Sequence, residues 1–285
     1  MILPTLAAAL AAWTGWIEPR ALRTRRHRVA IPGLAAPLRA VAIGDLQPWR
    51  HQWPARRLGA LVDRAAAEKP DIVFWLGDYY NAPTKGIARL LRRTRALDLY
   101  HRMQTPFADI VAQMARLTAP MGAFAVLGNH DWADENPLPG HDGAQALREA
   151  GIEPLIGRAA VARGPKGALT VIGLDDVSSK RPSRAEALLP ADAPAVLLTH
   201  APDIWDDLPH APALTLAGHS HGGQIRVPVL GAPVRTAHGR RRVLGRYDRP
   251  GASLIVTAGV GCSGLPLRFG VPPEIMAIDL HPAQP

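Results

Sequence analysis

Residues 123–131 read AFAVLGNHD, an apolar run that ends in a glycine and three polar side chains. Four other apolar runs end in a similar way, and their polar endings are Gly44-Asp45-Leu46-Gln47, Gly77-Asp78, Thr199-His200 and Gly218-His219-Ser220-His221. In α/β proteins, ligands bind at the carboxyl ends of the sheet strands. If these runs are strands of such a protein, we expect their five endings to converge on one polar site.

The spacing of the apolar runs predicts an α/β fold. Short runs over 41–43, 72–76 and 123–127 are separated by helical patterns over about 54–68 and 107–117. Later runs follow one another closely and predict a sheet with fewer intervening helices; they lie at 169–173, 195–199, 214–217, 254–258 and 275–278. A chain of 285 residues that is 47% hydrophobic is long enough for one such domain, expected over 39–282 behind an N-terminal arm.

The composition narrows the classes of partner and metal site. The chain has 33 Lys and Arg against 24 Asp and Glu, a formal charge of +9 that favours anionic partners such as phosphates or acidic lipids. Its one cysteine, Cys262, excludes an intramolecular disulfide and a multi-cysteine metal site. Aromatic residues make up only 5%, so there are few stacking platforms for single strands and no nucleic-acid partner is expected.

The polar strand endings supply metal ligands of mixed type. The candidate ligands among them are two carboxylates, an asparagine amide and three imidazoles, with Gln47 as a further oxygen donor. This set suits paired Mn, Fe, Zn or Co ions better than calcium. Two such ions can polarise a phosphoryl oxygen and hold an in-line displacement, as in phosphoester hydrolysis. Singly, an Asp after a strand is usually a cap or turn residue, so the hypothesis rests on the joint occurrence of these residues.

The order of these motifs resembles that of the calcineurin-like metallophosphoesterase superfamily. The family pattern is Asp-x-His, Gly-Asp, Gly-Asn-His-Asp/Glu, a later His and Gly-His-x-His, and the match runs from about Arg39 to Leu280. The resemblance implies a four-layer α/β/β/α sandwich. It also implies two divalent metal ions as cofactors, with manganese favoured and Fe, Zn or Co as alternatives.

The resemblance also implies a role for each matching residue. One metal would be held by Asp45, His221 and, in place of the usual histidine, Gln47. Asp78 would bridge both metals, and the second metal would be completed by Asn129, His200 and His219. His130 would stabilise the transition state or protonate the leaving oxygen as general acid. Asp131 would act beside it, by orienting His130 or a turn.

Gln47 departs from the family pattern. A glutamine oxygen is a neutral, weaker ligand than imidazole, so the first metal could bind less tightly, through water, or be a harder ion such as manganese. His51 is an alternative ligand four residues later, although Pro48 prevents a simple helical placement of both residues on one face. Its other interpretation is an ordinary loop residue.

A further set of motifs is similar to a membrane-associated bacterial branch of the superfamily. These motifs are residues 218–225 with Pro228, residues 259–263, Pro266, Arg268 and residues 273–275. Members of that branch are associated with an N-terminal anchor and with hydrolysis of UDP-2,3-diacylglucosamine in lipid A synthesis. The expected substrate is therefore a phosphate-containing lipid or a nucleotide-linked lipid.

The N-terminal segment 1–28 is expected to be a membrane anchor with a basic flank. Residues 1–17 carry no ionisable side chain, and five arginines follow between Arg20 and Arg28. If the segment spans, the positive-inside rule places the following domain on the cytoplasmic face of the inner membrane. The alternatives are an amphipathic helix that lies on the membrane or packs on the domain.

A second basic segment, at about 86–103, is a candidate amphipathic helix inserted after Asp78. Its arginines Arg89, Arg92 and Arg93 are candidates for contact with the substrate or with a membrane surface. The alternative is a solvated surface helix that packs through its apolar stripe.

The leading hypothesis is a membrane-anchored dinuclear phosphoesterase that hydrolyses a phosphodiester or pyrophosphate, with UDP-2,3-diacylglucosamine as the expected substrate. A second hypothesis is a broad phosphodiesterase or a phospholipase that acts on lipid headgroups. A third is a binding or scaffold protein whose site lost activity through Gln47.

Overall fold

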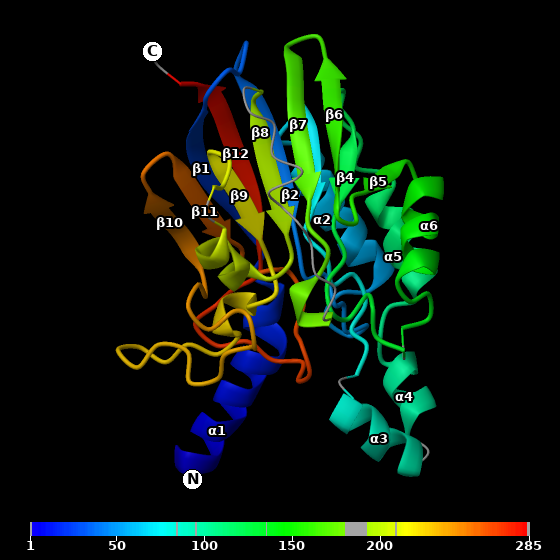
Figure 1. Ribbon diagram of the computed structural model, residues 1–285. Helices are drawn as coiled ribbons and strands as arrows, with labels where there is room; N and C mark the ends of the chain where they lie inside the picture. Colours follow the sequence, from blue (N-terminus) through cyan, green and yellow to red (C-terminus); the bar gives the residue numbers. More distant parts are fainter. Residues whose placement is uncertain are drawn as a thin grey trace.

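The computed structural model describes residues 2–83, 85–94, 96–134, 136–179, 193–208 and 210–283. Two six-stranded mixed sheets pack face to face, and their parallel strands point toward the same end of the molecule (Figure 1). The expected α/β fold is confirmed.

The first sheet carries three of the five polar strand endings. In spatial order its strands are β1 (Arg23–Ile31), β12 (Glu274–Pro282), β2 (Leu38–Ile43), β3 (Ile72–Trp75), β4 (Ala123–Ala125) and β5 (Ile152–Pro154). Strands β2 to β5 are parallel, and β12 runs antiparallel to β2. The endings after β2, β3 and β4 therefore share one edge.

The second sheet carries the other two endings. Its order is β10 (Gly245–Arg249), β11 (Ala252–Val256), β9 (Leu214–Ala217), β8 (Ala195–Thr199), β7 (Gly167–Gly173) and β6 (Arg158–Gly164). Strands β7, β8, β9 and β11 are parallel, and the edge strands β6 and β10 run antiparallel to their neighbours. Because both sheets consist mainly of short buried parallel strands, these strands read as continuous apolar runs.

Three helices cover the outer face of the first sheet: α2 (Ala55–Ala66), α5 (Phe107–Met114) and α6 (His141–Glu149). Helix α2 begins after Pro54 and buries Leu58, Leu61 and Val62 at helical spacing. Phe74, Leu76 and Leu216 contribute to a second core between the two sheets. Over the outer face of the second sheet, the described part of the chain places the 3-10 helix η5 (Pro202–Asp207), where an α-helical layer was expected.

The N-terminal segment differs from the expected anchor. It forms α1 (Ile2–Ala12), a π-helical turn (Trp13–Ile17) and a 3-10 turn (Glu18–Arg20). Among the described residues, no helix has both the length and the apolar composition needed to cross a bilayer. Eleven residues of α-helix span about 16 Å, against a hydrocarbon core of about 30 Å. The expectation of a spanning anchor was therefore wrong, and so was the inner-membrane localisation and orientation derived from it.

The end of this segment is fixed to the domain by specific hydrogen bonds. The buried Glu18 carboxylate accepts from the Val271 backbone N–H at 2.6 Å and from Trp13 Nε1 at 2.7 Å. The next residues continue directly into β1, which pairs in parallel with β12. The basic flank thus forms an edge strand, where Arg26 pairs with Glu68 at 2.7 Å.

The basic insertion forms two helices rather than one. These are α3 (Lys85–Arg93) and α4 (Leu97–Arg102), which project beyond the carboxyl ends of the strands (Figure 1). Helix α3 ends where the Thr94 hydroxyl donates back to the Leu90 carbonyl at 3.0 Å and the Ala96 N–H bonds to the Leu91 carbonyl. Within this segment, residue 95 lies outside the described residues.

Candidate metal centre

The candidate ligands lie on tight loops that leave the parallel strands. Positive φ angles occur at Asp45 (51°), Asp78 (55°), His219 (70°) and His221 (50°), a region of backbone conformation that costs energy for residues other than glycine. Gly128 is required beside them, because a Cβ there would lie 2.2 Å from Asp78 Oδ1. The backbone is thus constrained where the polar side chains converge.

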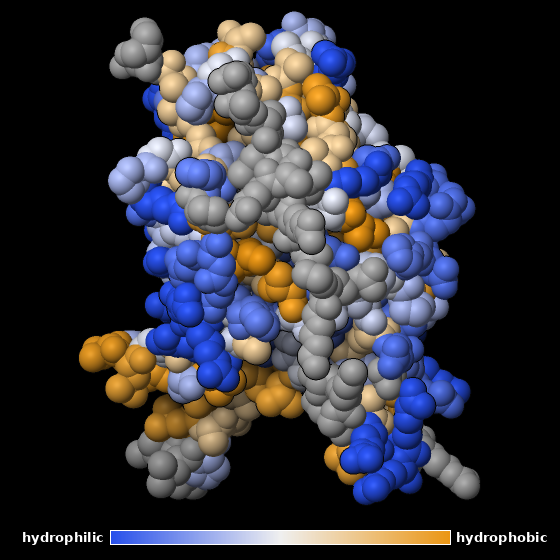
Figure 2. Space-filling view, in the orientation of Figure 1, coloured by the Kyte–Doolittle hydropathy of each residue, from blue (hydrophilic) through white to orange (hydrophobic). Residues whose placement is uncertain are grey.

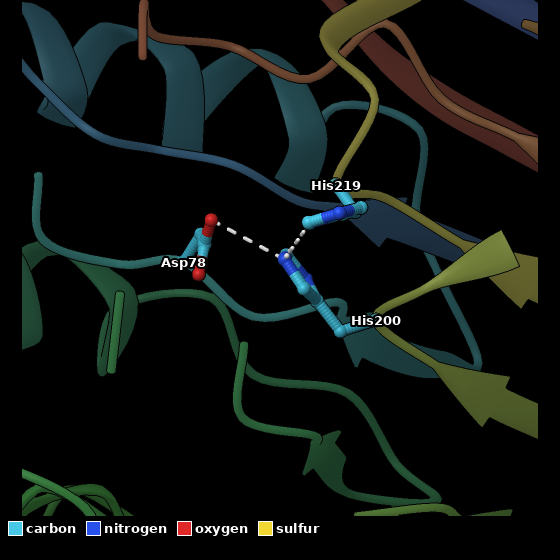
Figure 3. Close-up of side chains that lie close together, drawn as sticks. All are labelled: Asp78, His200 and His219. Atoms are coloured by element: carbon cyan, nitrogen blue, oxygen red, sulfur yellow. Dashed lines mark hydrogen bonds and ion pairs between the residues drawn. The ribbon is translucent and has the colours of Figure 1, made fainter. Parts of the chain in front are cut away.

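One group of donors consists of Asp78, His200 and His219 (Figure 3). His200 Nε2 lies 3.2 Å from Asp78 Oδ2 and 3.2 Å from His219 Nδ1. The remaining ring nitrogens are held by backbone carbonyls: His200 Nδ1 by Leu76 at 2.8 Å and His219 Nε2 by Ala237 at 2.5 Å. These carbonyls fix the rings so that their other nitrogens face Asp78 and each other.

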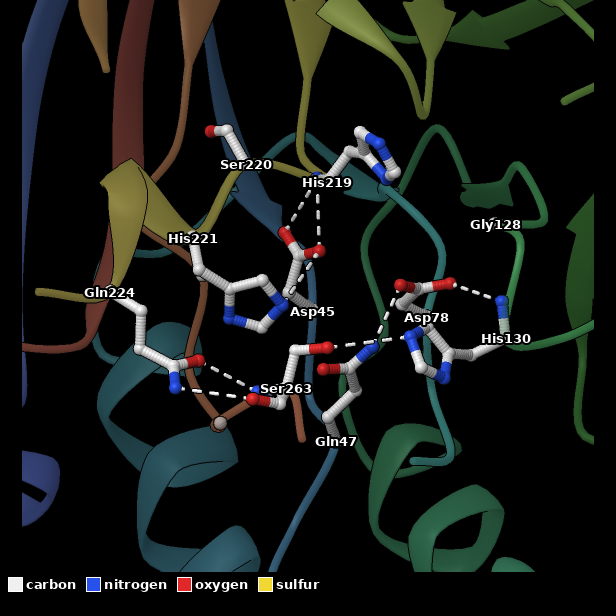
Figure 4. Close-up of polar contacts among 12 residues, drawn as sticks. Asp45, Gln47, Asp78, Gly128, His130, His219, Ser220, His221, Gln224 and Ser263 are labelled. Carbon is white, nitrogen blue, oxygen red and sulfur yellow. Dashed lines mark hydrogen bonds and ion pairs between the residues drawn. The ribbon is translucent and has the colours of Figure 1, made fainter. Parts of the chain in front are cut away.

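A second group consists of Asp45, Asp78 and His221 (Figure 4). His221 Nε2 lies 3.5 Å from Asp45 Oδ1, and the Asp45 carboxylate accepts the His219 backbone N–H at 2.9 and 3.1 Å. Asp78 belongs to both groups. In each group the ligand atoms lie within 4.8 Å of one another.

Gln47, and not His51, is the residue that the structure brings to these groups. Its Nε2 donates to Asp78 Oδ2 at 2.7 Å. His51 is instead exposed and stacks on Trp16, with ring centroids 6.5 Å apart. The loop after β2 therefore directs position 47 inward and position 51 toward the N-terminal segment.

Burial and neighbouring charges have opposite effects on the pKa values of the buried carboxylates. Burial raises the pKa of Asp45 to about 7. Burial also disfavours ionised Asp78, but the nearby His200 and His130 imidazoles hold its pKa below the ordinary value. His200 is the counterpart, because the Asp78 carboxylate outweighs the effect of burial and raises its pKa well above that of a free imidazole.

The other two imidazoles of the metal-ligand groups, those of His219 and His221, favour the neutral state in which histidine binds metals. Burial and the neighbouring His200 lower the pKa of His219 to about 4. Burial and the Arg268 guanidinium lower the pKa of His221 well below the ordinary value. Neutral imidazoles beside buried carboxylates form a donor set for a divalent cation.

Several side-chain atoms of the predicted ligands lack a hydrogen-bond partner in the protein, and these atoms show whether the donor set fits metal ions. Gln47 Oε1, Asn129 Oδ1 and His221 Nε2 are buried and make no hydrogen bond to the protein. Buried polar atoms are normally satisfied, so three such atoms on predicted metal ligands fit a further species that completes the site. The two amide oxygens have lone pairs suited to a divalent metal, and His221 Nε2 offers one in the tautomer whose proton is on Nδ1, so the residues fit such ions.

His130 lies beside the metal-ligand groups. Its backbone N–H donates to Asp78 Oδ1 at 2.9 Å, and its Nδ1 contacts the Ala82 carbonyl at 2.5 Å. Because a carbonyl only accepts, Nδ1 carries a proton, and Nε2 is free to act in the site. Nε2 lies 3.4 Å from the Ser263 hydroxyl (Figure 4).

Asp131 occupies a different position from His130 and contacts backbone. Its Oδ2 accepts from the N–H groups of Asp78 at 2.7 Å and Gly128 at 2.8 Å, and its Oδ1 accepts from the Tyr79 N–H at 2.9 Å. Burial, with the charge of Asp78, raises its pKa to about 7. The carboxylate therefore joins the loops after β3 and β4.

The three candidate arginines of the insertion, Arg89, Arg92 and Arg93, are exposed on α3. Their contact with a substrate stays a prediction.

Two further buried residues, Arg268 and Asp176, act on the predicted ligands, and neither of them was assigned a role from the sequence. Arg268 donates to the carbonyls of Ala258 and Val271, and its Nη2 lies 3.4 Å from His221 Nδ1. Asp176 follows β7 and accepts from the Ser179 N–H at 2.7 Å, and its charge opposes the lowering of the pKa of His200 and His219 by burial. The apolar run 169–174 before Asp176 was the signal that could have found it.

Comparison with known families agrees with this geometry. Residues 38–223 match the model of the calcineurin-like phosphoesterase family, which is more than half of the chain. The chain belongs to this family. The matched region begins with β2 and ends just after Gly218-His219-Ser220-His221, so it contains all the candidate metal ligands. This calcineurin-like phosphoesterase is a hydrolase of a family that binds divalent metals.

Two curated relatives extend the comparison across nearly the whole chain. The phosphoesterase is 30% identical to phosphodiesterase YaeI of Escherichia coli, over 98% of this chain and 97% of the relative. It is 24% identical to the UDP-2,3-diacylglucosamine pyrophosphatase LpxG of Chlamydia trachomatis, over 92% of this chain and 90% of the relative.

Proposed function

We propose that the protein is a dinuclear metallophosphoesterase that hydrolyses a phosphodiester or pyrophosphate bond. The observation that carries this proposal is the membership of Asp78 in both metal-ligand groups. One metal would be held by Asp45, Gln47, His221 and Asp78, and the other by Asp78, Asn129, His200 and His219. When bound, two divalent ions supply Lewis-acid polarisation of the phosphoryl group and hold it for in-line displacement.

The protein's own residues supply positioning and proton transfer. His130 donates from Nδ1 to the Ala82 carbonyl and presents Nε2 toward the site, so its imidazolium form, with a proton on each ring nitrogen, can protonate the leaving oxygen from Nε2 and return to the neutral ring. Asp131 keeps the backbone of Asp78 and Gly128 together, and so fixes the bridging carboxylate relative to His130. These contacts place the general acid and the shared ligand on one rigid unit.

For the substrate, we propose UDP-2,3-diacylglucosamine. The support is the chlamydial relative, which is named for that activity and matches over 92% of this chain. The charge of +9 also suits an anionic pyrophosphate. The E. coli relative, named only as a phosphodiesterase, supports a broad phosphodiesterase as the second candidate.

A substrate comparison separates these functions. Purified protein with Mn²⁺ is given UDP-2,3-diacylglucosamine or bis(para-nitrophenyl) phosphate, with His219→Ala as the inactive control. Release of UMP with a strong kcat/KM preference for the lipid nucleotide supports the proposed substrate. Activity on the simple diester alone supports the broad phosphodiesterase. Metal binding without turnover of either ester would contradict the enzymatic proposal and favour a binding protein.

A further inference from the structure

A cavity of about 330 Å³ opens beside the candidate metal centre. Its walls include His221, Gln224, Ile225, Val234, Leu265 and Leu267. This volume lies at the lower end of the range of about 300–1,000 Å³ that is typical of small-molecule sites. The cavity is large enough for part of a substrate.

The cavity is continuous with the site of the proposed reaction. His221, which lines it, belongs to a metal-ligand group, and Ser263, which also lines it, lies 3.4 Å from His130 Nε2. Figure 4 shows His221, Gln224 and Ser263 on the side of the site away from Gly128. A phosphoester held at the metals can therefore extend a substituent directly into the cavity.

The cavity walls are mainly apolar, because the polar atoms of Gln224 form hydrogen bonds within the wall and are not offered to a ligand. Its Oε1 accepts from the Ser263 N–H at 2.7 Å, and its Nε2 donates to the carbonyls of Ser263 and Leu265 at 3.1 Å each. These bonds fix the loop that carries Leu265 and Leu267. The aliphatic side chains of Ile225 and Val234 also line the cavity. Such a wall favours hydrocarbon over a hydrated group.

Exposed apolar side chains lie on the rim of the cavity. Val234 is 73% exposed and Leu265 is 64% exposed. On the same projecting loop as Val234, Val229 and Leu230 are 105% and 78% exposed, and Figure 2 shows hydrophobic surface gathered there. Contiguous exposed apolar surface is typical of binding sites.

We propose that this cavity binds the alkyl or acyl chain of the phosphoester substrate. This inference rests on the proposed function, and it assigns the chain to the wall formed by Ile225, Val234, Leu265 and Leu267. Substrates with a hydrocarbon substituent are then bound more tightly than those without one, because the chain leaves water as it enters the cavity.

Chain length provides the first test. The methyl, butyl and octyl esters of para-nitrophenyl phosphate are compared with Mn²⁺, below the concentrations at which the octyl ester forms micelles. We expect kcat/KM to rise by about three- to fourfold for each buried methylene until the cavity is filled. The double variant Val234→Asp/Leu265→Asp should lower the octyl-to-methyl ratio of kcat/KM at least about tenfold. Because both side chains are largely exposed, this variant should fold.

The matched control is Val229→Asp, a fully exposed valine that does not line the cavity. It should keep the wild-type octyl-to-methyl ratio. An equal fall in Val229→Asp would assign the effect to the general apolar surface and overturn the proposal. Hydrolysis of all three esters at the same kcat/KM would also overturn it, while the proposed function would stand.

Binding of dansyl-aminoundecanoic acid tests the cavity without turnover. Its fluorescence should rise with wild type and with Val229→Asp, and its Kd should increase at least about tenfold in Val234→Asp/Leu265→Asp. Equal Kd values in all three proteins would overturn the assignment of the wall. Metal-dependent hydrolysis of none of the esters would instead overturn the proposed function, and with it the assignment of the cavity to a substrate.

Discussion

Gln47 Nε2 donates a hydrogen bond to Asp78 Oδ2 across 2.7 Å, and this bond joins the loop after β2 to the carboxylate that both metal-ligand groups share. The bond also orients the amide, because the nitrogen must face the carboxylate. Gln47 Oε1 is then left without a protein partner, as a metal ligand would be. The residue that departs from the family pattern thus occupies the site and has a free oxygen.

Replacing Gln47 tests this arrangement. Gln47→Ala removes both the oxygen and the hydrogen bond to Asp78, so we expect affinity for Mn²⁺ to fall about 10- to 100-fold at one of two sites. Gln47→His supplies an imidazole and should restore tight binding at that site. Calorimetric titration of metal-free protein measures both constants. Unchanged affinity in Gln47→Ala would show that Gln47 is not a ligand.

His130→Gln tests the general acid. We expect kcat to fall by about 10²- to 10⁴-fold, because protonation of the leaving oxygen is lost. The fall should be larger for an alkyl leaving group than for para-nitrophenolate, which leaves without a proton. Bound metal, measured by elemental analysis, should stay at the wild-type amount. The same loss for both leaving groups would contradict the assigned role.

Asp131→Asn tests the carboxylate that joins two loops. An asparagine has one acceptor oxygen, so at least one of the buried N–H groups of Asp78, Gly128 and Tyr79 would lose its partner. We expect the free energy of unfolding of the metal-free protein to fall by about 1–3 kcal/mol. Urea denaturation measures the change, and the exposed Asp134→Asn is the control. Equal free energies of unfolding for the two variants would contradict the structural role of Asp131.

His27 predicts a pH dependence of stability away from the metal centre. On β1, burial and the charges of Arg25 and Arg246 lower its pKa from 6.5 to about 4. The unfolded chain therefore binds a proton at His27 more tightly than the folded chain does. The resulting contribution to the free energy of unfolding is fully present above pH 6.5 and is lost as the pH falls toward 4.

The corresponding variant is His27→Gln, which cannot titrate. It should show a smaller loss of unfolding free energy than wild type between about pH 7 and about pH 4, measured by urea denaturation at each pH. The exposed His210→Gln should retain the wild-type loss. A His27→Gln profile parallel to that of wild type would contradict the prediction.

Local patterns sufficed for the central parallel strands because most of these strands are buried and apolar on both faces. The apolar run 72–76 predicts a buried strand, and the glycine before Asp78 predicts a tight turn. Neither prediction needs the residues that pack against them in the fold. The convergence of Asp45, Asp78 and His219 followed from the rule that parallel strands end at one edge. Contacts such as that of Arg268 with His221 depend on loops 47 residues apart, and no local pattern reports them.

The N-terminal segment shows where a local pattern misleads. Hydropathy detects the apolar side chains of residues 1–17, but it does not detect the end of α1 at Ala12 or the docking of Glu18 on the Val271 N–H. The local pattern also misleads at the insertion. Apolar residues continue at helical spacing through 86–103, whereas hydrogen bonds from the Thr94 hydroxyl and the following backbone end α3 at Arg93. Hydrogen bonds decide both boundaries.

Metal titration with simultaneous assay tests the central claim most directly. Metal-free protein is titrated with Mn²⁺ while bound metal and hydrolysis of bis(para-nitrophenyl) phosphate are followed in wild type and Asp78→Ala. Because Asp78 belongs to both metal-ligand groups, wild type should bind two ions per chain with activity that follows their binding, and Asp78→Ala should lose both ions and activity. Full activity in the metal-free protein, or wild-type activity in Asp78→Ala, would contradict the account.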